Sequence, residues 1–556
     1  MIGAGDAGSK FPTEPMAASQ ASARFLKSLD RPLVWWLLFA VVAATAASRF
    51  SIDGTSDLGN YHLYNGFGAL HDRRALDIFP AQMQTGFFYG LDAVYYTIFS
   101  SFNNRPALIN ILLSIPYSVA ALAIFLIARL IAKPSFRWPS LMSAAAALFG
   151  LTGASTFATL ATTASDVVPG VAILIALARW LHLEKANRNT VWTALGVGAV
   201  ADVSVGLKFT QAPLFVGMFL AIAVRLAIGK RSALLEAFAF GVGGVIVFAA
   251  LDGAWLWGNA RAYGNPIFPL MNNVFRSDLV EPTPWTDLRF MPKSQLMALF
   301  YPAYWAFRPS SDVSELLMRD PRVLIGCASA AVIIFAFAVR WLRDRAPPPI
   351  GSPQSLALSL AIMFLVSYAL WEKVWSIYRY LAVQESLTGA LVLAALAMAF
   401  GSRGKPWLMS GLFALLLIAT LRTTQYPDWH RLPRGPQAIA LRLPPLEPNA
   451  MVLFLDDSPY AFIVPSMPES ARAIGVNSNL VHPGSQGRLW SMIEAAVHGH
   501  QGSLWGVEDP HDHPGVADVS LSSLGLARDG ECVPLITNME VGEHAKMCRL
   551  RRGSTP

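Results

Sequence analysis

The residues best suited to chemistry follow the first long apolar segment of the chain. Asp57 opens the run DLGNYHLYNGF, in which Tyr61 and Tyr64 come four and seven residues later. In an α-helix this spacing places the carboxylate and both phenols on one face. Such a carboxylate can take a proton from a hydroxyl group or hold a divalent metal ion. The alternative is that Asp57, with Ser56, only caps the helix.

Two further acids lie near the ends of apolar segments. Asp53 precedes Asp57 by four residues and is either its partner or an ordinary loop residue. Asp166, in the run ATTASDVVPG, either faces the same cleft or caps the helix that starts before Pro169. The residues themselves leave both choices open.

Three cations have a comparable placement. Lys208 lies in the turn GLKFTQ, Arg261 follows an apolar segment, and Arg379 stands beside Tyr380 in EKVWSIYRYLAV. If they converge on one cleft, they would suit a phosphate or diphosphate group. The alternative for Lys208 and Arg379 is that each anchors its helix at the lipid headgroups.

The elements that must position these residues are long apolar segments. The chain has 556 residues, 54% hydrophobic and 14% charged, whereas soluble proteins have about 25% charged residues. A membrane span needs about 20 apolar residues. About eleven windows come close to this requirement: residues 33–48, 107–131, 139–163, 167–182, 191–206, 209–228, 234–257, 322–342, 354–371, 381–400 and 406–421. This composition excludes a soluble cytoplasmic enzyme and predicts an α-helical polytopic membrane protein.

The basic residues predict its orientation. Every second connection between the windows carries Lys or Arg, as expected of the cytoplasmic side. The net charge of +7 therefore reflects topology and does not indicate nucleic-acid binding. We expect a multi-pass inner-membrane protein with a cytoplasmic N-terminal tail over residues 1–31 and external loops over residues 49–106 and 258–321. In the first loop, Phe87, Phe88, Tyr95, Tyr96 and Phe99 are expected at the level of the lipid headgroups.

Residues 422–556 have a different composition, richer in proline and charge. The run MVLFLDD at 451–457 predicts a buried strand, and residues 487–500 predict a helix. This part is predicted to be a small extracytoplasmic α/β domain. Cys532 and Cys548 lie within it and either pair or stay free.

Taken together, residues 30–421 resemble the polytopic glycosyltransferases of the C-type fold, which include the dolichyl- and undecaprenyl-phosphate-sugar-dependent mannosyltransferases and the lipid A aminoarabinose transferases. In that superfamily a long external loop with an acid near its start follows the first span, as Asp57 does in SDLGNYHLYNGF. Asp166 matches a further acid after the third span, and GLKFTQ resembles a turn that carries a lysine. The segment GNPIFPLMN and the pair Arg379-Tyr380 look like features of bacterial members.

The resemblance implies that residues 32–421 are a transmembrane glycosyltransferase domain. It implies inverting transfer of a sugar from a polyprenyl-phosphate donor to a glycan, lipid or protein acceptor outside the membrane, with Asp57 as general base and cations stabilising the departing phosphate. No nucleotide sugar is needed, and the need for a divalent metal stays open. The residues expected to bind substrate are Asp53, Tyr61, Tyr64, Asp166, Lys208, Arg261, Arg379 and Tyr380. The domain after residue 421 would recognise the acceptor or carrier, stabilise the fold or bind a partner.

Two other functions compete with this one. A flippase or transporter of polyprenyl-linked glycans should have ionisable residues deep in several spans and internal repeats, and Asp202 is the main residue of that kind. A noncatalytic envelope-assembly protein predicts no convergence of acid and cations. The chain has no GxxxxGK[ST] motif, so an ATP-driven pump is not expected.

Overall fold

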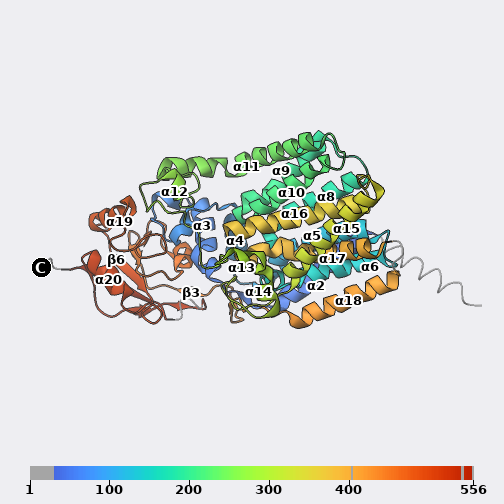
Figure 1. The fold of residues 1–556 in the computed structure, drawn as a ribbon. Helices are drawn as coiled ribbons and strands as arrows, with labels where there is room; N and C mark the ends of the chain where they lie inside the picture. Colours follow the sequence, from blue (N-terminus) through green and yellow to red (C-terminus); the bar gives the residue numbers. More distant parts are fainter. Residues whose placement is uncertain (1–30, 402–404, 540–543, 554–556) are drawn as a thin grey trace, which may run out of the picture.

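The computed structural model describes residues 31–401, 405–539 and 544–553. It consists of a long helix bundle with a smaller α/β region at one end (Figure 1). Residues 1–30 of the predicted cytoplasmic tail lie outside the described residues. We refer to the end of the bundle that meets the α/β region as its domain-facing end.

Nine helical stretches among the described residues are long and apolar enough to cross a membrane. They are α2 (Pro32–Arg49), α5 (Pro106–Ala132), α8 (Val167–Lys185), Phe209–Leu226 with α10 (Ala212–Ala223) at its centre, α11 (Ala233–Tyr263), α15 (Arg322–Asp344), α16 (Pro353–Val374), Tyr378–Phe400 with η6 (Tyr378–Leu381) and α17 (Ala382–Phe400), and α18 (Pro406–Thr423). Two shorter apolar helices, α6 (Pro139–Leu151) and α9 (Val191–Leu207), accompany them. The predicted polytopic helical fold is confirmed, whereas the predicted count of about eleven spans is not: nine helical stretches of the described residues meet the criteria.

The predicted window at residues 139–163 is wrong in its second half. Helix α6 ends at Leu151, and the chain continues through the short helix α7 (Ala154–Ala158) and a series of turns. Gly153 is required at the start of α7, because a Cβ atom there would lie 2.0 Å from the carboxyl carbon of Glu385. Polar contacts of this segment, described below, replace the continuation of the helix.

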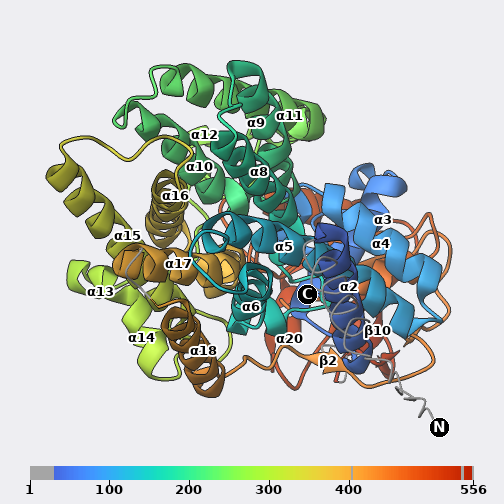
Figure 2. The same cartoon turned by 90° about the vertical axis from the view of Figure 1, so that its right-hand side faces the viewer.

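Helices α5 and α17 occupy the middle of the bundle (Figure 2). Residues 382–395 of α17 are buried without interruption, because other helices surround this segment on every side. At the edge of the bundle, α9 and α11 pack closely through glycines. A Cβ atom on Gly198 would lie 1.9 Å from the Phe240 carbonyl oxygen, and one on Gly243 would lie 2.0 Å from that of Leu195. Small residues at such contacts let the two backbones approach, as is common in membranes.

Short elements cover the domain-facing end. From the first loop come η1 (Leu58–His62), α3 (Leu63–Leu70), η2 (Arg73–Ala75), η3 (Gln82–Gly86) and α4 (Gly90–Phe102); from the second come α12 (Asn272–Phe275), α13 (Gln295–Leu299) and α14 (Tyr301–Phe307). The expected placement at the headgroups is wrong for Tyr95 and Phe99. Their exposed fractions are 1% and 2%, since α4 packs this face into the protein core.

The α/β region contains a mixed sheet with the strand order β5-β4-β6-β10-β7, and β8 also pairs with β10. Its strands are β4 (Met451–Phe454), β5 (Arg472–Gly475), β6 (Leu504–Glu508), β7 (Leu526–Arg528), β8 (Val533–Pro534) and β10 (Lys546–Arg552), and its helices are α19 (Arg488–Gly499) and α20 (Val516–Ser523). Strand β4 runs parallel to β5 and β6. The predicted buried strand and helix are confirmed, and Cys532 is bonded to Cys548.

The first loop and the α/β region are joined by backbone pairing and by hydrogen bonds from the buried Arg73 side chain. Strand β1 (Ile52–Asp53) pairs with β2 (Arg431–Leu432), and Ile78 forms a bridge with Ile474 beside the sheet. Arg73 forms an ion pair of 2.8 Å with Asp77 and also donates to backbone carbonyls after residue 468. The α/β region is therefore attached firmly to the segment that carries Asp57.

Candidate functional site

Five charged residues, Asp57, Asp166, Lys208, Glu315 and Arg379, meet at the domain-facing end; we call them the charged cluster. Asp57 forms an ion pair with Arg379. The Arg379 Nε atom also lies 3.0 Å from a carboxylate oxygen of Glu315, which comes from the second loop. Asp57 precedes η1 but makes no capping hydrogen bond with its side chain. The capping alternative for Asp57 is therefore wrong.

Lys208 and Asp166 form the second pair of the charged cluster. The Lys208 Nζ atom lies 3.0 Å from Asp166 Oδ1, which also accepts a hydrogen bond of 3.1 Å from the Thr210 hydroxyl group. Lys208 Nζ is 5.4 Å from the centre of the Tyr380 ring, and the Arg379 guanidinium is 5.3 Å from the same ring. Both cations thus lie close to the Tyr380 ring, and the two ion pairs share one site.

The charged cluster is largely sequestered but still reaches the surroundings. The exposed fractions of the side chains are 16% for Asp57, 12% for Arg379 and 20% for Lys208. Burial raises the pKa of Asp57, but nearby positive charges, that of Arg379 foremost, outweigh it and lower that pKa to about 2. Asp57 is therefore ionised at neutral pH. Each of these three side chains is thus partly exposed.

Of the two predicted tyrosines, only Tyr61 belongs to this site. Burial and the charge of Asp57 raise the pKa of Tyr61 well above its usual value, so its phenol keeps its proton. Tyr64 instead donates a hydrogen bond of 3.0 Å to Asp77. The prediction for Tyr64 assumed α-helical spacing, whereas η1 is a π-helix, in which the hydrogen bonds join residues five apart. The wider turn moves Tyr64 away from the face of Asp57.

Asp53 and Arg261 also lie outside the charged cluster. Asp53 is fully buried, and its carboxylate accepts hydrogen bonds of 2.6 Å from the backbone N–H and the hydroxyl group of Thr163. It thereby fixes the start of the first loop to the segment before α8. Arg261 is exposed on α11, its guanidinium lies 5.7 Å from the centre of the Trp257 ring, and it forms no ion pair with any described residue. Two of the three predicted cations converge, and Arg261 does not join them.

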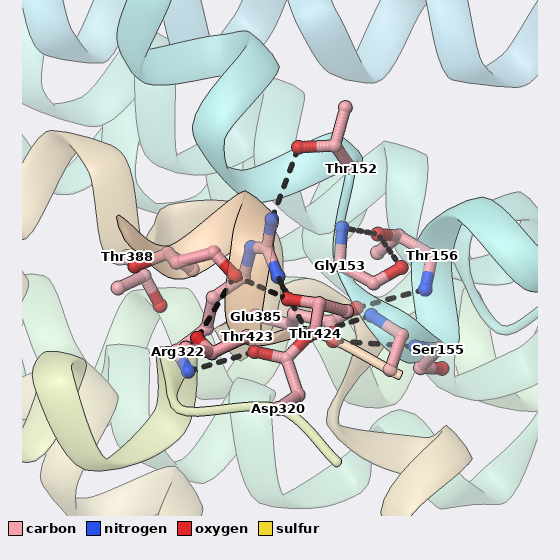
Figure 3. A network of polar contacts seen from close by, with 12 residues as sticks. Thr152, Gly153, Ser155, Thr156, Asp320, Arg322, Glu385, Thr388, Thr423 and Thr424 are labelled. Carbon is pink, nitrogen blue, oxygen red and sulfur yellow. Dashed lines mark hydrogen bonds and ion pairs between the residues drawn. The ribbon is translucent and has the colours of Figure 1, made fainter. Parts of the chain in front are cut away.

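Next to the charged cluster lies a second set of polar contacts, which we call the buried network (Figure 3). Glu385 accepts hydrogen bonds from the backbone N–H groups of Ser155 and Thr156, at 3.2 and 2.8 Å, and from the Tyr378 hydroxyl group at 2.8 Å. Asp320 and Arg322 form an ion pair of 2.7 Å, and both side chains have an exposed fraction of 0%. The buried network thus joins three segments that are far apart in the sequence.

Each nitrogen atom of the Arg322 side chain has a hydrogen-bond partner here. Besides Asp320, the guanidinium donates to the Phe149 carbonyl oxygen at 2.6 Å and to the hydroxyl groups of Thr424 and Thr152 at 2.9 and 3.1 Å. Asp320 accepts a further hydrogen bond of 2.7 Å from the backbone N–H of Ala154. These contacts explain why the chain leaves the helical path after α6.

The buried network also positions Arg379. Tyr378, which donates to Glu385, is its neighbour in the chain, and the Ser155 hydroxyl group donates to the Arg379 carbonyl oxygen at 3.1 Å. Sequence reasoning missed Glu315 and the buried network, because their partners come from distant segments without a local motif. Arg322, at the start of the apolar helix α15, was a sequence signal for the buried network, since a cation buried there requires an acid nearby.

One group of side chains among residues 31–401, 405–539 and 544–553 has the geometry of a metal site: Glu508, Cys532 and Cys548. Its two cysteines form the disulfide, so neither is available as a thiolate ligand. Within the charged cluster, each of the acids Asp57 and Asp166 faces a cation. Glu315 is the third carboxylate of the charged cluster, so an anion reaches Lys208 or Arg379 only by displacing a carboxylate.

No protein-family model matches the chain, and a search among curated proteins also found no match.

Proposed function

We propose that the chain is an integral membrane glycosyltransferase that moves a sugar from a polyprenyl-phosphate donor to a cell-envelope acceptor at the extracytoplasmic side of the membrane. One observation carries this proposal: the two cations Lys208 and Arg379 and the carboxylate of Asp57 share one partly exposed site at the end of the helix bundle. A lipid-linked phosphate would reach that level from the membrane, and an acceptor would reach it from the side of the α/β region.

Arg379 and Lys208 are suited to bind the donor phosphate. A guanidinium offers a fork of N–H donors that matches phosphate oxygens, and a lysine adds a compact charge. Both cations are now held by carboxylates, so the phosphate competes with Asp57 and Glu315 for Arg379 and with Asp166 for Lys208. Donor binding therefore rearranges the charged cluster.

This exchange prepares Asp57 to act as a base. Burial raises the pKa of Asp57, and Arg379 is the group that lowers it most. When Arg379 turns toward the phosphate, its effect on Asp57 weakens while the burial persists. The pKa of the Asp57 carboxyl group then rises, and the carboxylate accepts a proton more readily.

The transfer step follows from these roles. Asp57 takes the proton of the acceptor hydroxyl group, and the acceptor oxygen forms a bond to the anomeric carbon of the sugar. The bond from that carbon to the phosphate oxygen breaks, and its electron pair leaves with the lipid phosphate, which Arg379 and Lys208 stabilise. Attack opposite the leaving group inverts the anomeric configuration.

A transporter of polyprenyl-linked glycans is the second candidate, and a specific observation favours it. Asp202 on α9 and Asp252 on α11 have exposed fractions of 5% and 0%, and Asp202 Oδ2 and both carboxylate oxygens of Asp252 accept no hydrogen bond from the described residues. Acids inside membrane helices commonly mark ion or proton pathways. Their function is separate from the charged cluster, in which acid and cation are paired.

A transfer assay separates these functions. The purified protein in lipid nanodiscs is supplied with polyprenyl-phosphate sugars and a hydroxyl acceptor mixture from the cell envelope. We expect Asp57→Asn to reduce transfer by about 100-fold or more, the usual range for a general base. The control is Asp72→Asn: Asp72 is exposed in the same loop and has a φ of 50°, which asparagine also adopts. This control should match the wild type.

Two outcomes would contradict the proposal in different ways. Unchanged transfer by Asp57→Asn removes Asp57 as the base. Absence of transfer by the wild type, together with movement of a fluorescent polyprenyl-linked glycan across reconstituted vesicles, replaces the glycosyltransferase by the transporter.

A further inference from the structure

A cavity of about 460 Å³ lies where the second loop meets the α/β region; we call it the junction cavity. Its walls come from residues 273–282, in and after α12, and from residues 486–487, directly before α19. Helices α12 and α19 mark its position in Figure 1. The volume lies within the range of about 300–1,000 Å³ that is usual for small-molecule sites, which are frequent between domains. The residues that line it are different from those of the charged cluster.

The wall from the second loop is held in a fixed shape by the buried Asn272 side chain. Its Nδ2 atom lies within hydrogen-bond distance of the carbonyl oxygens of three residues: Ser277 at 3.2 Å, Val280 at 3.1 Å and Glu281 at 3.0 Å. Arg276, within the same segment, has a φ of 54°, which a residue other than glycine rarely adopts. Conformations of this kind persist where surrounding contacts enforce them, and they cluster at ligand-binding sites.

The two walls are also joined to each other through their backbones. The Arg488 N–H donates to the Asp278 carbonyl oxygen at 2.8 Å, and the Leu489 N–H donates to that of Leu279 at 3.0 Å. Gly487 has a φ of 110°, and a Cβ atom on it would lie 2.5 Å from the Leu279 carbonyl oxygen. Glycine is therefore required where the walls meet. The junction cavity is thus a built feature of the contact between the second loop and the α/β region.

Four side chains that line the junction cavity have hydrogen-bonding groups that are not in use. They are the carboxamides of Asn273 and Gln486, the guanidinium of Arg276 and the carboxylate of Glu281. All four residues are exposed, and their side chains form no hydrogen bond or ion pair within the part of the chain that the structure describes. Asp278, the other acid of the lining, is paired with Arg488 at 3.0 Å. In contrast to the charged cluster, this site can bind a ligand without breaking an ion pair.

The lining favours an uncharged ligand that both donates and accepts hydrogen bonds. The charges of Arg276 and Glu281 balance, so the junction cavity offers no excess charge to a phosphate. Carboxamides donate and accept, a guanidinium only donates, and a carboxylate only accepts. The hydroxyl groups of a sugar ring do both, so one ring can satisfy all of these groups. Turns and the short helix α12 form the walls, so an extended peptide finds no strand edge for pairing.

We propose that the junction cavity is a binding site for an uncharged sugar unit of a glycan. Asn273, Arg276 and Glu281 bind the sugar from the second loop, and Gln486 binds it from the α/β region. The site holds its ligand by hydrogen bonds and takes no part in covalent chemistry. Binding itself is independent of the charged cluster. Only the identification of this glycan as the acceptor rests on the proposed function.

The test measures binding to the full-length protein in nanodiscs by saturation-transfer difference NMR. The probes are glucose, galactose, mannose, rhamnose and N-acetylglucosamine, with inorganic phosphate and trialanine as competitors. We expect one or more of the sugars to bind and neither competitor to displace it. Glu281→Ala and Gln486→Ala, which alter opposite walls, should each weaken binding by about 3- to 10-fold, the effect of one lost hydrogen bond.

Two control variants accompany this experiment. Gln501→Ala is matched to Gln486→Ala, because Gln501 is an exposed glutamine of the α/β region outside the junction cavity. Asp57→Asn alters the charged cluster alone. Both should bind the sugar as the wild type does.

The outcomes separate this proposal from the proposed function. Failure of every sugar to bind, or binding that both wall variants leave unchanged, overturns the carbohydrate site. An equal loss in Gln501→Ala overturns it as well, and so does a loss in Asp57→Asn, because the sugar then binds at the charged cluster. Displacement by phosphate or trialanine replaces it by an anion or peptide site. If the expected pattern of binding is found but the wild type transfers no sugar, the carbohydrate site is supported and only the proposed function fails.

Discussion

The charged cluster and the buried network are two sets of ion pairs at the same end of the bundle. They differ in how completely their side chains are buried and hydrogen-bonded. In the buried network, Asp320 and Arg322 have exposed fractions of 0%, and Arg322 donates to three further oxygen atoms. In the charged cluster, Asp57 and Arg379 are 16% and 12% exposed. Arg322 and Asp320 satisfy each other within the protein, whereas the charged cluster is partly exposed and, under the proposed function, exchanges its partners for the donor phosphate.

This contrast explains how the partly exposed charged cluster is held in place by the fully buried network. A buried ion pair is retained only if further hydrogen bonds compensate the loss of water, and the buried network meets this condition. The same network holds Tyr378 and the Arg379 carbonyl oxygen, so the rigid part positions the exchangeable part. We therefore expect damage to the buried network to reduce stability and damage to the charged cluster to reduce activity.

Arg322→Ala should have the strongest consequence for the buried network. This change leaves Asp320 as an unpaired buried charge, and loss of one partner of a buried pair typically costs about 3–5 kcal/mol. The free energy of unfolding, measured by denaturant titration in detergent, should fall by about that amount. The control is Arg343→Ala at the other end of α15, where Arg343 is exposed and pairs with exposed Asp344. A similar loss in the control would contradict the difference between the two regions.

Arg379→Ala should reduce activity more strongly than stability. Loss of one group that stabilises a developing negative charge commonly reduces turnover by about 100-fold. The unfolding free energy should fall less than in Arg322→Ala, because the Asp57 carboxylate left behind is partly exposed. The measurements are kcat and KM for the polyprenyl-phosphate donor, next to the same denaturant titration. Arg261→Ala is the control, because the structure places Arg261 away from the charged cluster. Equal losses in both variants would restore Arg261 to the site and contradict its placement.

Tyr378→Phe should have a weak and mixed effect. It removes one of three hydrogen bonds to Glu385 and keeps the two from the α7 backbone. We expect the unfolding free energy to fall by about 1 kcal/mol and the transfer rate to fall only a few-fold through displacement of Arg379. A loss of transfer as large as that of Arg379→Ala, at unchanged stability, would mean that Tyr378 acts on the substrate.

Local sequence patterns are sufficient to predict the helices of the bundle and the buried strand of the α/β region. Each apolar window overlaps at least one helix, and the run MVLFLDD contains a fully buried strand, because hydrophobicity and period decide both. The pairing of Cys532 with Cys548 is one of two alternatives that the sequence leaves open, since spacing alone does not show whether two cysteines meet. Lys208 and Asp166 also meet as expected of one shared cleft.

The remaining features depend on contacts between distant segments. The periodicity of an α-helix predicts Tyr64 beside Asp57, but the π-helical turn moves it to Asp77. Arg261, like Lys208, is a cation near the end of an apolar segment, but α11 presents Arg261 on the exposed surface. Glu315 meets Arg379 only because the second loop folds over the end of the bundle. Partners of this kind carry no local signal, so a single sequence could not identify them.

The position of a bound polyprenyl phosphate is the decisive measurement for the proposed site. An electron cryomicroscopy structure of the protein with this lipid phosphate should place the phosphate within about 3 Å of the Arg379 guanidinium and the Lys208 ammonium group, the usual length of a charge-assisted hydrogen bond. The Asp57–Arg379 pair should then be broken, and the Asp57 carboxylate should face the space beside the phosphate. A phosphate bound elsewhere, with the Asp57–Arg379 pair intact, would contradict the proposed site.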